Sequence, residues 1–280
     1  MAEIIKGKLI AKAICEKAQS RIAKLAHPPG LAVILVGDDP ASHLYVGLKE
    51  TAAKKLGIFV EKILLPSNVS TYDLIGKIKD LNTREDIHGI LVQLPLPEQD
   101  EDLVVAAIEP SKDVDGFHPE NRKRLTNGHA MFVPPVILAI MRLIRATHQP
   151  LARKQAVIVG NSHIFAEPLL QLLKEAETRP SFLPKDEPAL GAKTRVADII
   201  VVAVGQAGFI TKDMVKDGAI IIDVGTNKKD GKTVGDVDPA VQDVAGFMSP
   251  VPGGVGPLTV SYLLMNVWKA AVLDPQKKTD

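Results

Sequence analysis

Two kinds of apolar segment alternate along the first half of the chain. Short continuous apolar runs are typical of strands that are buried on both faces. Apolar residues spaced three and four positions apart are typical of amphipathic helices. The resulting β-α-β-α-β order, which follows a first helix, favours a parallel sheet with right-handed crossovers. Strands are predicted at 31–37, 59–65 and 88–94, and helices at 10–25, 41–56 and 71–81.

The alternation stops at residues 95–128 and then resumes. This stretch has several prolines and no clear periodicity, and long connections of that kind are uncommon unless they are functional or join domains. Pro134 and Pro135 then open a helix that carries the chain into a second unit. The polar tail at 275–280 is expected to fray. The second unit is predicted to contain strands at 156–160, 181–183, 199–204 and 219–224, helical segments at 136–147, 167–175, 214–217 and 259–273, and a Gly/Pro loop at 251–257.

The composition is that of a globular protein without a strong electrostatic preference. Hydrophobic residues make up 46% and charged residues 24% of the chain, which excludes a disordered protein. Lys+Arg 34 against Asp+Glu 33 gives a net charge of +1, so no overall field attracts nucleic acid or an anionic membrane. Aromatic residues are only 4%, too few to favour a platform for stacking nucleic-acid bases. We therefore expect no nucleic-acid partner and no membrane.

The cysteine content and the N-terminus indicate the compartment. Cys15 is the only cysteine, which excludes an intramolecular disulfide and a cysteine-clustered zinc site and fits a reducing compartment. The N-terminus has no apolar stretch long enough for a signal-peptide core. No run approaches the ~20 apolar residues that span a bilayer. We expect a soluble, cytoplasmic protein.

The helix predicted at 41–56 carries the first candidate for acid–base chemistry. Ser42, Tyr45 and Lys49 are three and four residues apart and therefore share one helical face. Burial or a neighbouring cation would lower the pKa of the lysine toward neutrality and make it a usable general base. The alternative is an exposed lysine and a half-buried tyrosine on an ordinary surface helix.

Two further positions could bind a heterocycle. Gln93 ends a predicted strand, where ligands of open α/β sheets bind, and its amide offers both donors and an acceptor. Asp115 could accept two N–H donors from an amino-heterocycle. The alternatives are a turn-forming glutamine and an ordinary Asp-Gly turn. Asp113, Asp115 and His118 supply too few ligands to favour a metal site, so no metal is expected.

Two segments in the second half combine glycine with a favourable position. Gly160-Asn161-Ser162 follows a strand and opens a helix, a context that suits phosphate binding, although the pattern is not GxGxxG. His163 beside it is either a base or a solvent-exposed turn residue. The segment 249–259 contains three glycines and three prolines. Such a loop lets the backbone approach a flat ligand closely, and we interpret it as functional.

Seven segments stand in one order along nearly the whole chain. They are VGDDPASHLYVGLKETAAKKLGI, GILVQLPLP, PSKDVDGFHPEN, ADIIVVAVGQAGFI, GAIIIDVGTN, GDVD and SPVPGGVGPLT. One short motif would be weak support for a relationship, whereas seven at compatible spacing are strong support. Together these segments resemble the bifunctional methylenetetrahydrofolate dehydrogenase/cyclohydrolase family.

The resemblance implies a fold and two reactions. The fold is α/β with two domains and a cleft between them: an N-terminal folate and catalytic domain, 1–133 plus 258–280, and a C-terminal Rossmann-like domain, 134–257, that binds the dinucleotide. A hydride leaves 5,10-methylenetetrahydrofolate for NADP, with NAD as the alternative cofactor, and water then converts the methenyl product to 10-formyltetrahydrofolate. The resemblance also implies tetrahydrofolate derivatives as ligands, a homodimer, and a role in one-carbon metabolism and purine biosynthesis.

The resemblance assigns roles to the residues that match the family's motifs. Lys49 would manage protons during water addition, Tyr45 would stack on the substrate, and Gln93 would help to hold Lys49. Asp115 would receive N–H donors from the pterin ring, and the loop 252–257 would close over the substrate. The implied catalytic residues are Lys49, Tyr45, Gln93 and Asp115; the substrate-binding residues are Tyr45, Ser42, Gln93, Leu94, Pro95, Asp115, Pro252, Gly253 and Gly254; and the cofactor-binding residues are Gly160, Asn161, Ser162, Lys185, Gly205, Gly225 and Thr226.

The cofactor half departs from the family pattern. Asn161 stands where the family usually has an arginine that helps to bind the 2′-phosphate of NADP, and Ala166 stands where it usually has glycine. Lys185 could replace the lost charge, whereas Asp186 could favour a ribose diol and hence NAD. Thr226 replaces a position that is often hydrophobic.

The linker departs as well, since 134–137 reads Pro-Pro-Val-Ile in place of Pro-Cys-Thr-Pro. Three alternatives to the bifunctional NADP enzyme therefore stay open. They are a cyclohydrolase that has lost its cofactor, an NAD-dependent enzyme, and a non-catalytic folate-binding paralogue.

Overall fold

The computed structural model describes residues 1–273, so the tail expected to fray at 275–280 lies outside the described residues. The chain forms two compact units. We call Met1–Ala11 with Val136–Thr259 the six-stranded unit, and Lys12–Pro135 with the chain from Val260 onward the three-stranded unit. Helices α1 (Gly7–Ile22) and α9 (Val255–Leu273) each run from one unit into the other.

The three-stranded unit is built on a fully parallel sheet. Its central strand β2 (Gly30–Val36) lies between β3 (Phe59–Leu65) and β4 (Gly89–Val92). All seven residues of β2 are buried, as its continuous apolar run predicts for a strand covered on both faces.

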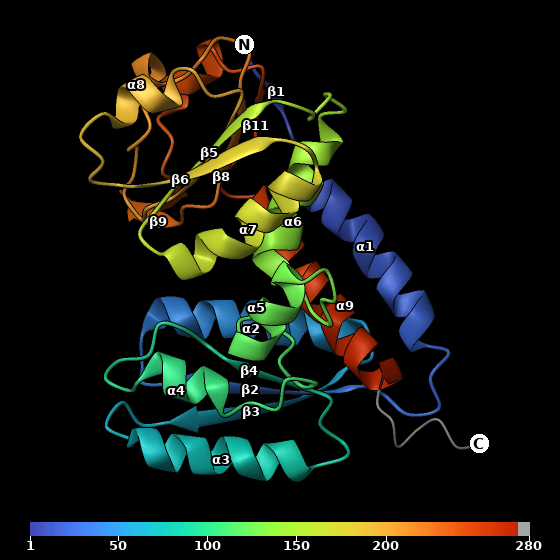
Figure 1. Cartoon of the computed structure of the whole chain (residues 1–280). Coiled ribbons are helices and arrows are strands. Elements are labelled where there is room, and N and C mark those ends of the chain that lie inside the picture. Colours follow the sequence, from blue (N-terminus) through green and yellow to red (C-terminus); the bar gives the residue numbers. More distant parts are fainter. Residues whose placement is uncertain (274–280) are drawn as a thin grey trace. The chain divides into compact units, whose positions relative to one another are not determined.

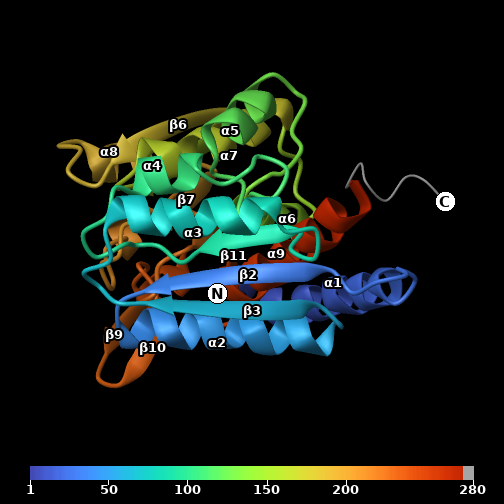
Figure 2. The ribbon, with the colours of Figure 1, turned by 90° about the horizontal axis from the view of Figure 1, so that it is seen from below.

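Helices cover both faces of this sheet. Leu31, Val33 and Leu35 of β2 share a core with α2 (Pro40–Lys55) and α9. The alternate residues of β2 share the opposite core with α3 (Thr71–Thr83) and α4 (Glu101–Ala106). Figure 2 shows β2 and β3 running side by side between α3 and α2. The unit also contains α5 (Pro119–Thr126).

The six-stranded unit has a parallel sheet in the order β1-β11-β8-β7-β5-β6. The chain enters at β5, moves outward to β6, and then crosses to β7 on the other side of β5. The order therefore reverses between β5 and β7, and this switch point is where doubly wound sheets bind ligands. The strands are β1 (Glu3–Ile4), β5 (Gln155–Gly160), β6 (Arg179–Pro184), β7 (Ile199–Ala203), β8 (Ile220–Asp223) and β11 (Phe247–Met248).

Helices lie on both faces of this sheet, with α8 on one side and α7 on the other (Figure 1). Alternate residues of β5, β7 and β8 form one buried core with residues from α8 and the loops. The remaining elements of this unit are α6 (Pro135–Ala146), α7 (His163–Glu175), α8 (Leu190–Thr194), the short helices η1 (Lys212–Met214) and η2 (Pro239–Asp243), and the hairpin β9 (Asn227–Lys229) to β10 (Lys232–Val234). Among residues 1–273, no helix has the length and apolar character needed to cross a membrane.

The structure confirms the two-domain α/β fold and shows which short elements the periodicity missed. The segment 95–128, which has no long apolar period, contains α4 and α5. Helix α7 begins four residues before the predicted start because Ser162 caps it. Helix α9 begins at Val255 instead of 259, with Pro257 in its first turn, where a proline costs no intrahelical hydrogen bond.

The unit boundaries differ from the sequence-based ones at the N-terminus. The sequence analysis placed residues 1–11 with the folate domain. In the structure they belong to the six-stranded unit, because Glu3 and Ile4 of β1 pair with Phe247 and Met248 of β11. A strand of two residues carries no periodic signal, so its partner could not be read from the sequence.

Candidate active site and dinucleotide site

Helix α2 presents the predicted acid–base face. Asp39 caps the helix, because its Oδ2 accepts the Ser42 backbone N–H and the Ser42 hydroxyl, each at 2.8 Å. Ser42 is only 7% exposed, and its hydroxyl is used in the hydrogen bond to the capping carboxylate of Asp39. Tyr45 is 37% exposed. Lys49 follows one turn later on the same side of the helix and is partly buried.

Gln93 connects the end of β4 to Lys49. Its backbone N–H continues the sheet pairing by donating to Ile34 O at 2.9 Å. Its side-chain Oε1 accepts from Lys49 Nζ at 2.9 Å, and its Nε2 donates to Leu94 O at 2.7 Å. Both ends of the amide are therefore fixed, with the oxygen turned toward the ammonium group. Leu94 is partly buried and Pro95 is exposed beyond it.

The turn that carries Asp115 is held by its neighbour Asp113. The Asp113 carboxylate accepts the N–H of Gly116 at 3.0 Å and of His118 at 2.9 Å, and the Asn121 amide at 2.9 Å. Gly116 has φ +75°, and a Cβ there would lie 2.9 Å from Pro134 N. Asp113 therefore fills the turn-forming role considered for this motif, which leaves the partly exposed carboxylate of Asp115 free of that task.

The pKa values of Lys49 and Asp115 both shift in the direction that favours the neutral form of each group. Burial lowers the pKa of Lys49, and the charge of Asp115 opposes that shift. Burial raises the pKa of Asp115 to about 6, against the charge of Lys49 and with a smaller push from Asp113. In both groups the loss of solvent outweighs the attraction between them. An amine whose neutral form is favoured by burial and a carboxylate acceptor thus belong to one site.

The six-stranded unit gathers the predicted cofactor residues at its switch point. Gly160 ends β5 and pairs with Ala203 of β7 on one side and Pro184 of β6 on the other. Asn161 Nδ2 donates to Val204 O at 2.9 Å, which joins the loops after β5 and β7. Ser162 Oγ accepts the Phe165 N–H at 3.4 Å and caps α7.

These features fit a dinucleotide. The site lies at the carboxyl ends of parallel strands, and the N-terminus of the 13-residue helix α7 opens directly onto it. Gly205 after β7 is exposed with φ +70°, and a Cβ there would meet no atom within 4 Å. The loop therefore offers open space on that side of its backbone.

Ala166, one of the departures from the family pattern, and Lys185, the candidate replacement for the missing charge, have different surroundings. Ala166 is fully buried in α7, so its methyl group packs inside the protein and does not line open space. Its effect, if any, is on the spacing between the helix and the sheet. Lys185 is exposed and directly follows Pro184, the residue paired with Gly160. His163 is an exposed residue at the start of α7, with its ring edge-on to Phe182 at 5.5 Å.

Two buried carboxylates behind this site were missed as functional candidates. Asp236 is fully buried and Asp223 is 2% exposed. Asp223 accepts the N–H groups of Gly225, Asp236 and Val237, yet burial raises its pKa to about 6. The segment GDVD contained Asp236, and the glycine before an acidic residue was the signal that could have marked it. Thr226, between Gly225 and β9, is exposed.

The Gly/Pro loop belongs to the six-stranded unit, whereas Lys49 and Asp115 belong to the three-stranded unit. Gly253 O accepts the Lys8 N–H at 2.9 Å, and Gly254 is buried with a Cβ position 2.6 Å from Pro250 O. Only glycine fits at 254. Pro252 is exposed, and a role of the loop as a substrate cover stays a prediction.

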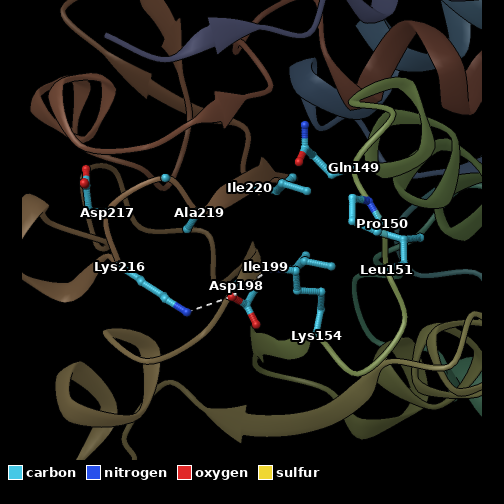
Figure 3. A pocket seen from close by; sticks show the side chains of 11 residues that line it. Gln149, Pro150, Leu151, Lys154, Asp198, Ile199, Lys216, Asp217, Ala219 and Ile220 are labelled. Atoms are coloured by element: carbon cyan, nitrogen blue, oxygen red, sulfur yellow. Dashed lines mark hydrogen bonds and ion pairs between the residues drawn. The ribbon is translucent and has the colours of Figure 1, made fainter.

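A pocket of about 190 Å³ lies away from these residues, beside the amino ends of β7 and β8 and opposite the carboxyl ends where Gly160 and Gly205 lie. Asp198 in the lining of this pocket accepts from Lys216 Nζ at 2.8 Å, and Lys154 Nζ is 3.5 Å from the same carboxylate (Figure 3). The carboxylate thus offsets part of the charge of the two lysines. Within residues 1–273, no group of His, Cys, Asp and Glu side chains is arranged to hold a metal ion.

Comparisons with known proteins cover both units. A family model described as "Tetrahydrofolate dehydrogenase/cyclohydrolase, catalytic domain" matches residues 5–115. A second, described as "Tetrahydrofolate dehydrogenase/cyclohydrolase, NAD(P)-binding domain", matches residues 134–274. The "Bifunctional protein FolD" of Cupriavidus taiwanensis is 45% identical over 276 residues, which are 96% of this chain and 98% of that protein.

Solved structures agree with this similarity. The bifunctional FolD methylenetetrahydrofolate dehydrogenase/cyclohydrolase of Campylobacter jejuni is 40% identical with a TM-score of 0.93, covering 97% of this chain and 99% of that one. The Trypanosoma brucei enzyme, solved with NADP cofactor and an inhibitor, is 34% identical with a TM-score of 0.91, covering 97% of each chain. The chain therefore belongs to the tetrahydrofolate dehydrogenase/cyclohydrolase family.

Proposed function

We propose that this protein is a bifunctional enzyme that works on folate-bound one-carbon units. It oxidises 5,10-methylenetetrahydrofolate to 5,10-methenyltetrahydrofolate with NADP, and it hydrolyses that product to 10-formyltetrahydrofolate. The observation that carries this proposal is the Lys49–Gln93 hydrogen bond of 2.9 Å in a site that also contains Asp115. The Cupriavidus taiwanensis and Campylobacter jejuni relatives, which are similar over their full length, are named bifunctional, and the Trypanosoma brucei relative was solved with NADP.

The comparisons do not favour the three alternatives considered from the sequence. Both halves of the chain match their own domain model, including the NAD(P)-binding half in which the departures lie. A match to the NAD(P)-binding domain model is not what we expect of a cyclohydrolase that has lost its cofactor site. The catalytic residues Lys49, Gln93 and Asp115 are all present and interact, which argues against a non-catalytic paralogue.

The oxidation needs the substrate to be held with its methylene bridge facing the cofactor. When bound, NADP supplies the acceptor for the hydride. Asp115 accepts N–H groups of the pterin ring and fixes its rotation, and Tyr45 stacks on the substrate through its 37% exposed side chain. Leu94 and Pro95 complete the substrate side of the site, and Ser42 supports it through the cap of the helix that carries Tyr45 and Lys49. Loss of the hydride leaves a carbon cation shared by the two flanking nitrogens of the folate.

The hydrolysis uses Lys49 as a proton carrier. Water adds to the methenyl carbon, and its proton passes to the neutral Lys49 amine, which burial makes available by lowering the lysine pKa. The bond from that carbon to N5 then breaks, and N5 takes a proton from the Lys49 ammonium. The remaining hydroxyl proton leaves to solvent as the formyl C=O forms. Gln93 keeps the amine in place through both transfers.

In the six-stranded unit, the switch point would hold NADP. Gly160, Asn161 and Ser162 at the start of α7 would bind its phosphates, and the loops with Gly205, Gly225 and Thr226 would complete the site. Lys185 would supply the charge for the 2′-phosphate, because it follows the residue paired with Gly160 and is exposed. The cover formed by Pro252, Gly253 and Gly254, the homodimer and the cytoplasmic location stay predictions from the sequence.

Lys49→Met tests the proposed function. The side chain keeps its length and loses the titratable amine, so methenyl hydrolysis should fall by about 10²–10⁴-fold above the spontaneous rate. Lys55→Met, an exposed lysine at the end of the same helix, is the matched control and should keep wild-type activity. Binding of a folate analogue should persist in both. Hydrolysis by Lys49→Met at the wild-type rate would remove Lys49 from the mechanism.

A further inference from the structure

The loop after β7 is held by one buried side chain. Asp236 Oδ2 accepts the N–H groups of Val204 at 2.6 Å and Gly205 at 3.0 Å. Its Oδ1 accepts the N–H of Gln206 at 2.9 Å and the Asn227 side-chain amide at 2.8 Å. Three consecutive backbone N–H groups therefore point inward at a single carboxylate, which fixes the course of the loop.

Asp236 is itself held by a second buried carboxylate. Asp223 Oδ1 accepts the Asp236 N–H at 3.0 Å, and Oδ2 accepts the Val237 N–H at 3.0 Å. The same Oδ1 accepts the Gly225 N–H at 2.9 Å, in the second loop assigned to the cofactor. The Asp223 N–H in turn donates to Ser249 Oγ at 2.8 Å. One network thus reaches the loops after β7 and β8.

The glycines of this region fit the two carboxylates closely. A Cβ on Gly225 would lie 2.2 Å from Asp236 Cγ, and a Cβ on Gly235 would lie 1.8 Å from Asp223 Oδ2. Neither position tolerates a side chain without moving a carboxylate. Gly225 of GAIIIDVGTN and Gly235 of GDVD are therefore required by the carboxylates behind the loops.

The network ends on residues that face solvent. Gly205 and Gln206 are exposed although their N–H groups are bound inside, and Asn161 donates to the Val204 carbonyl on the opposite side of the same loop. Burying a carboxylate is costly unless donors compensate it. Four donors compensate the charge of Asp236. The result is an exposed backbone of fixed shape, which is what a preorganised binding site requires.

We propose that Asp236 is a positioning residue for dinucleotide binding: it acts through the loop 204–206, with Asp223 holding it in place. This inference rests on the proposed function, because NADP is the ligand that the loop serves. Asp236 touches no ligand in this account. Its contribution is that Gly205 and Asn161 keep the geometry that the cofactor meets, so its loss weakens cofactor binding in particular.

Asp236→Asn is the first test. The amide keeps one acceptor but turns an NH₂ group toward backbone donors, which releases part of the loop. The dissociation constant for NADP, measured by calorimetry, should rise by about tenfold or more. Affinity for a folate analogue should stay within about twofold, since Asp115 and Lys49 lie in the other unit. Amide hydrogen exchange without any ligand should become faster at Val204, Gly205 and Gln206.

Asp238→Asn is the matched control. Asp238 is two residues along the same segment and caps η2 by accepting the Ala240 N–H at 2.8 Å. Its substitution removes a cap and leaves the loop 204–206 alone, so NADP affinity should stay within about twofold of wild type. Equal NADP affinity of Asp236→Asn and wild type would overturn the proposal. A wild-type protein that binds no dinucleotide at millimolar concentration would instead overturn the proposed function.

A measurement on the wild-type chain decides the matter if Asp236→Asn does not fold. NADP should slow hydrogen exchange at Gly205, Gln206 and Gly225, because a bound ligand suppresses opening of the loops it contacts. Slower exchange at the start of α7 with no change at these three amides would show that the cofactor binds without the network. That result would overturn the proposal as well.

Discussion

In the three-stranded unit the candidate site consists of side chains that reach one another: Lys49 donates to Gln93, and Asp115 interacts with both the lysine and Asp113. In the six-stranded unit the site consists mainly of backbone. Gly160, Gly205 and Gly225 offer no side chains, and Asp223 and Asp236 work from behind. We expect the three-stranded unit to supply the chemistry and the six-stranded unit to supply a shaped binding surface.

The difference predicts that the two units tolerate substitutions differently. A side-chain site depends on the identity of each residue, and Tyr45, Lys49, Gln93 and Asp115 all match the family motifs. A backbone site depends on loop geometry, which several side chains can support. Asn161 and Ala166 depart from the family pattern, yet Asn161 binds the loop at Val204 and Ala166 is packed inside. A substitution in one unit should therefore change the binding of folate or of the dinucleotide without changing the binding of the other.

Asp115→Ala is expected to have the largest effect among the tests of this separation. The carboxylate is proposed to pair with pterin N–H groups, and a charged hydrogen bond contributes roughly 1.5–3 kcal/mol, or about tenfold to a hundredfold in affinity. Calorimetry with a folate analogue should show that loss, with NADP affinity unchanged. Asp80→Ala removes an exposed carboxylate of α3 and serves as the control. Unchanged folate affinity would return Asp115 to an ordinary Asp-Gly turn.

The pH dependence of folate binding should show the same carboxylate. The pKa of Asp115 is about 6, above its ordinary value of 3.8, so the acceptor is lost as pH falls below 6. Affinity for a folate analogue should weaken between pH 7 and pH 5 by up to about tenfold per pH unit below the pKa. The profile of Asp115→Asn should be flat over that range. A wild-type profile that is equally flat would contradict the assignment.

The pH dependence of stability has the opposite sign to the pH dependence of folate binding. Because folding raises the pKa of Asp115, this group contributes most to the free energy of unfolding below its ordinary pKa, and that contribution is lost as pH rises through about 6. Acidification from pH 7 to pH 5 should therefore weaken folate binding while the stability contributed by Asp115 increases. Thermal unfolding of wild type and Asp115→Asn at both pH values separates the two effects.

Much of the fold could be predicted from apolar periodicity. The strand at 59–65 was placed to the residue, and the strands around Val33, Ile158, Val201 and Ile222 were found because buried parallel strands are continuous apolar runs. The short elements β1, α4 and α5 could not be found, because a strand of two residues and helices of six and eight residues are too short to show a period. Their positions depend on pairing and capping contacts that are distant in sequence.

The candidate sites also divide into features that a local sequence pattern predicts and features that depend on contacts distant in sequence. The spacing of Tyr45 and Lys49 predicted a shared helical face, and the strand end predicted that Gln93 lies near a ligand site. The sequence could not show that Asp113 forms the turn while Asp115 does not, because the two carboxylates are only two residues apart in the chain. Asp223 and Asp236 were missed because their partners are backbone N–H groups, which every sequence contains.

Asn161→Arg tests the six-stranded unit, where it should change NADP affinity and leave folate affinity unchanged. A guanidinium at this position would add a charge-assisted contact to the 2′-phosphate and strengthen NADP binding by about 1 kcal/mol, or roughly fivefold. The Asn161 hydrogen bond to Val204 O is lost in the exchange, which limits the gain. NAD affinity should not improve, and folate affinity should not change. A gain shared by both dinucleotides would contradict the 2′-phosphate as the target.

Lys185→Ala should have the smallest effect, because an exposed charge contributes only about 0.2–1 kcal/mol. NADP affinity should fall by no more than about fivefold while NAD affinity stays the same. The preference of wild type for NADP over NAD should also shrink as salt rises, since the 2′-phosphate contact is screened. Lys174→Ala, an exposed lysine at the end of α7, controls for the overall charge of the unit. If Lys185→Ala lowers both affinities equally, Lys185 supports the end of β6 and does not read the phosphate. If it lowers neither, the selectivity for NADP must come from the backbone around Asn161 and Ser162, and the shaped surface alone would then distinguish the two cofactors.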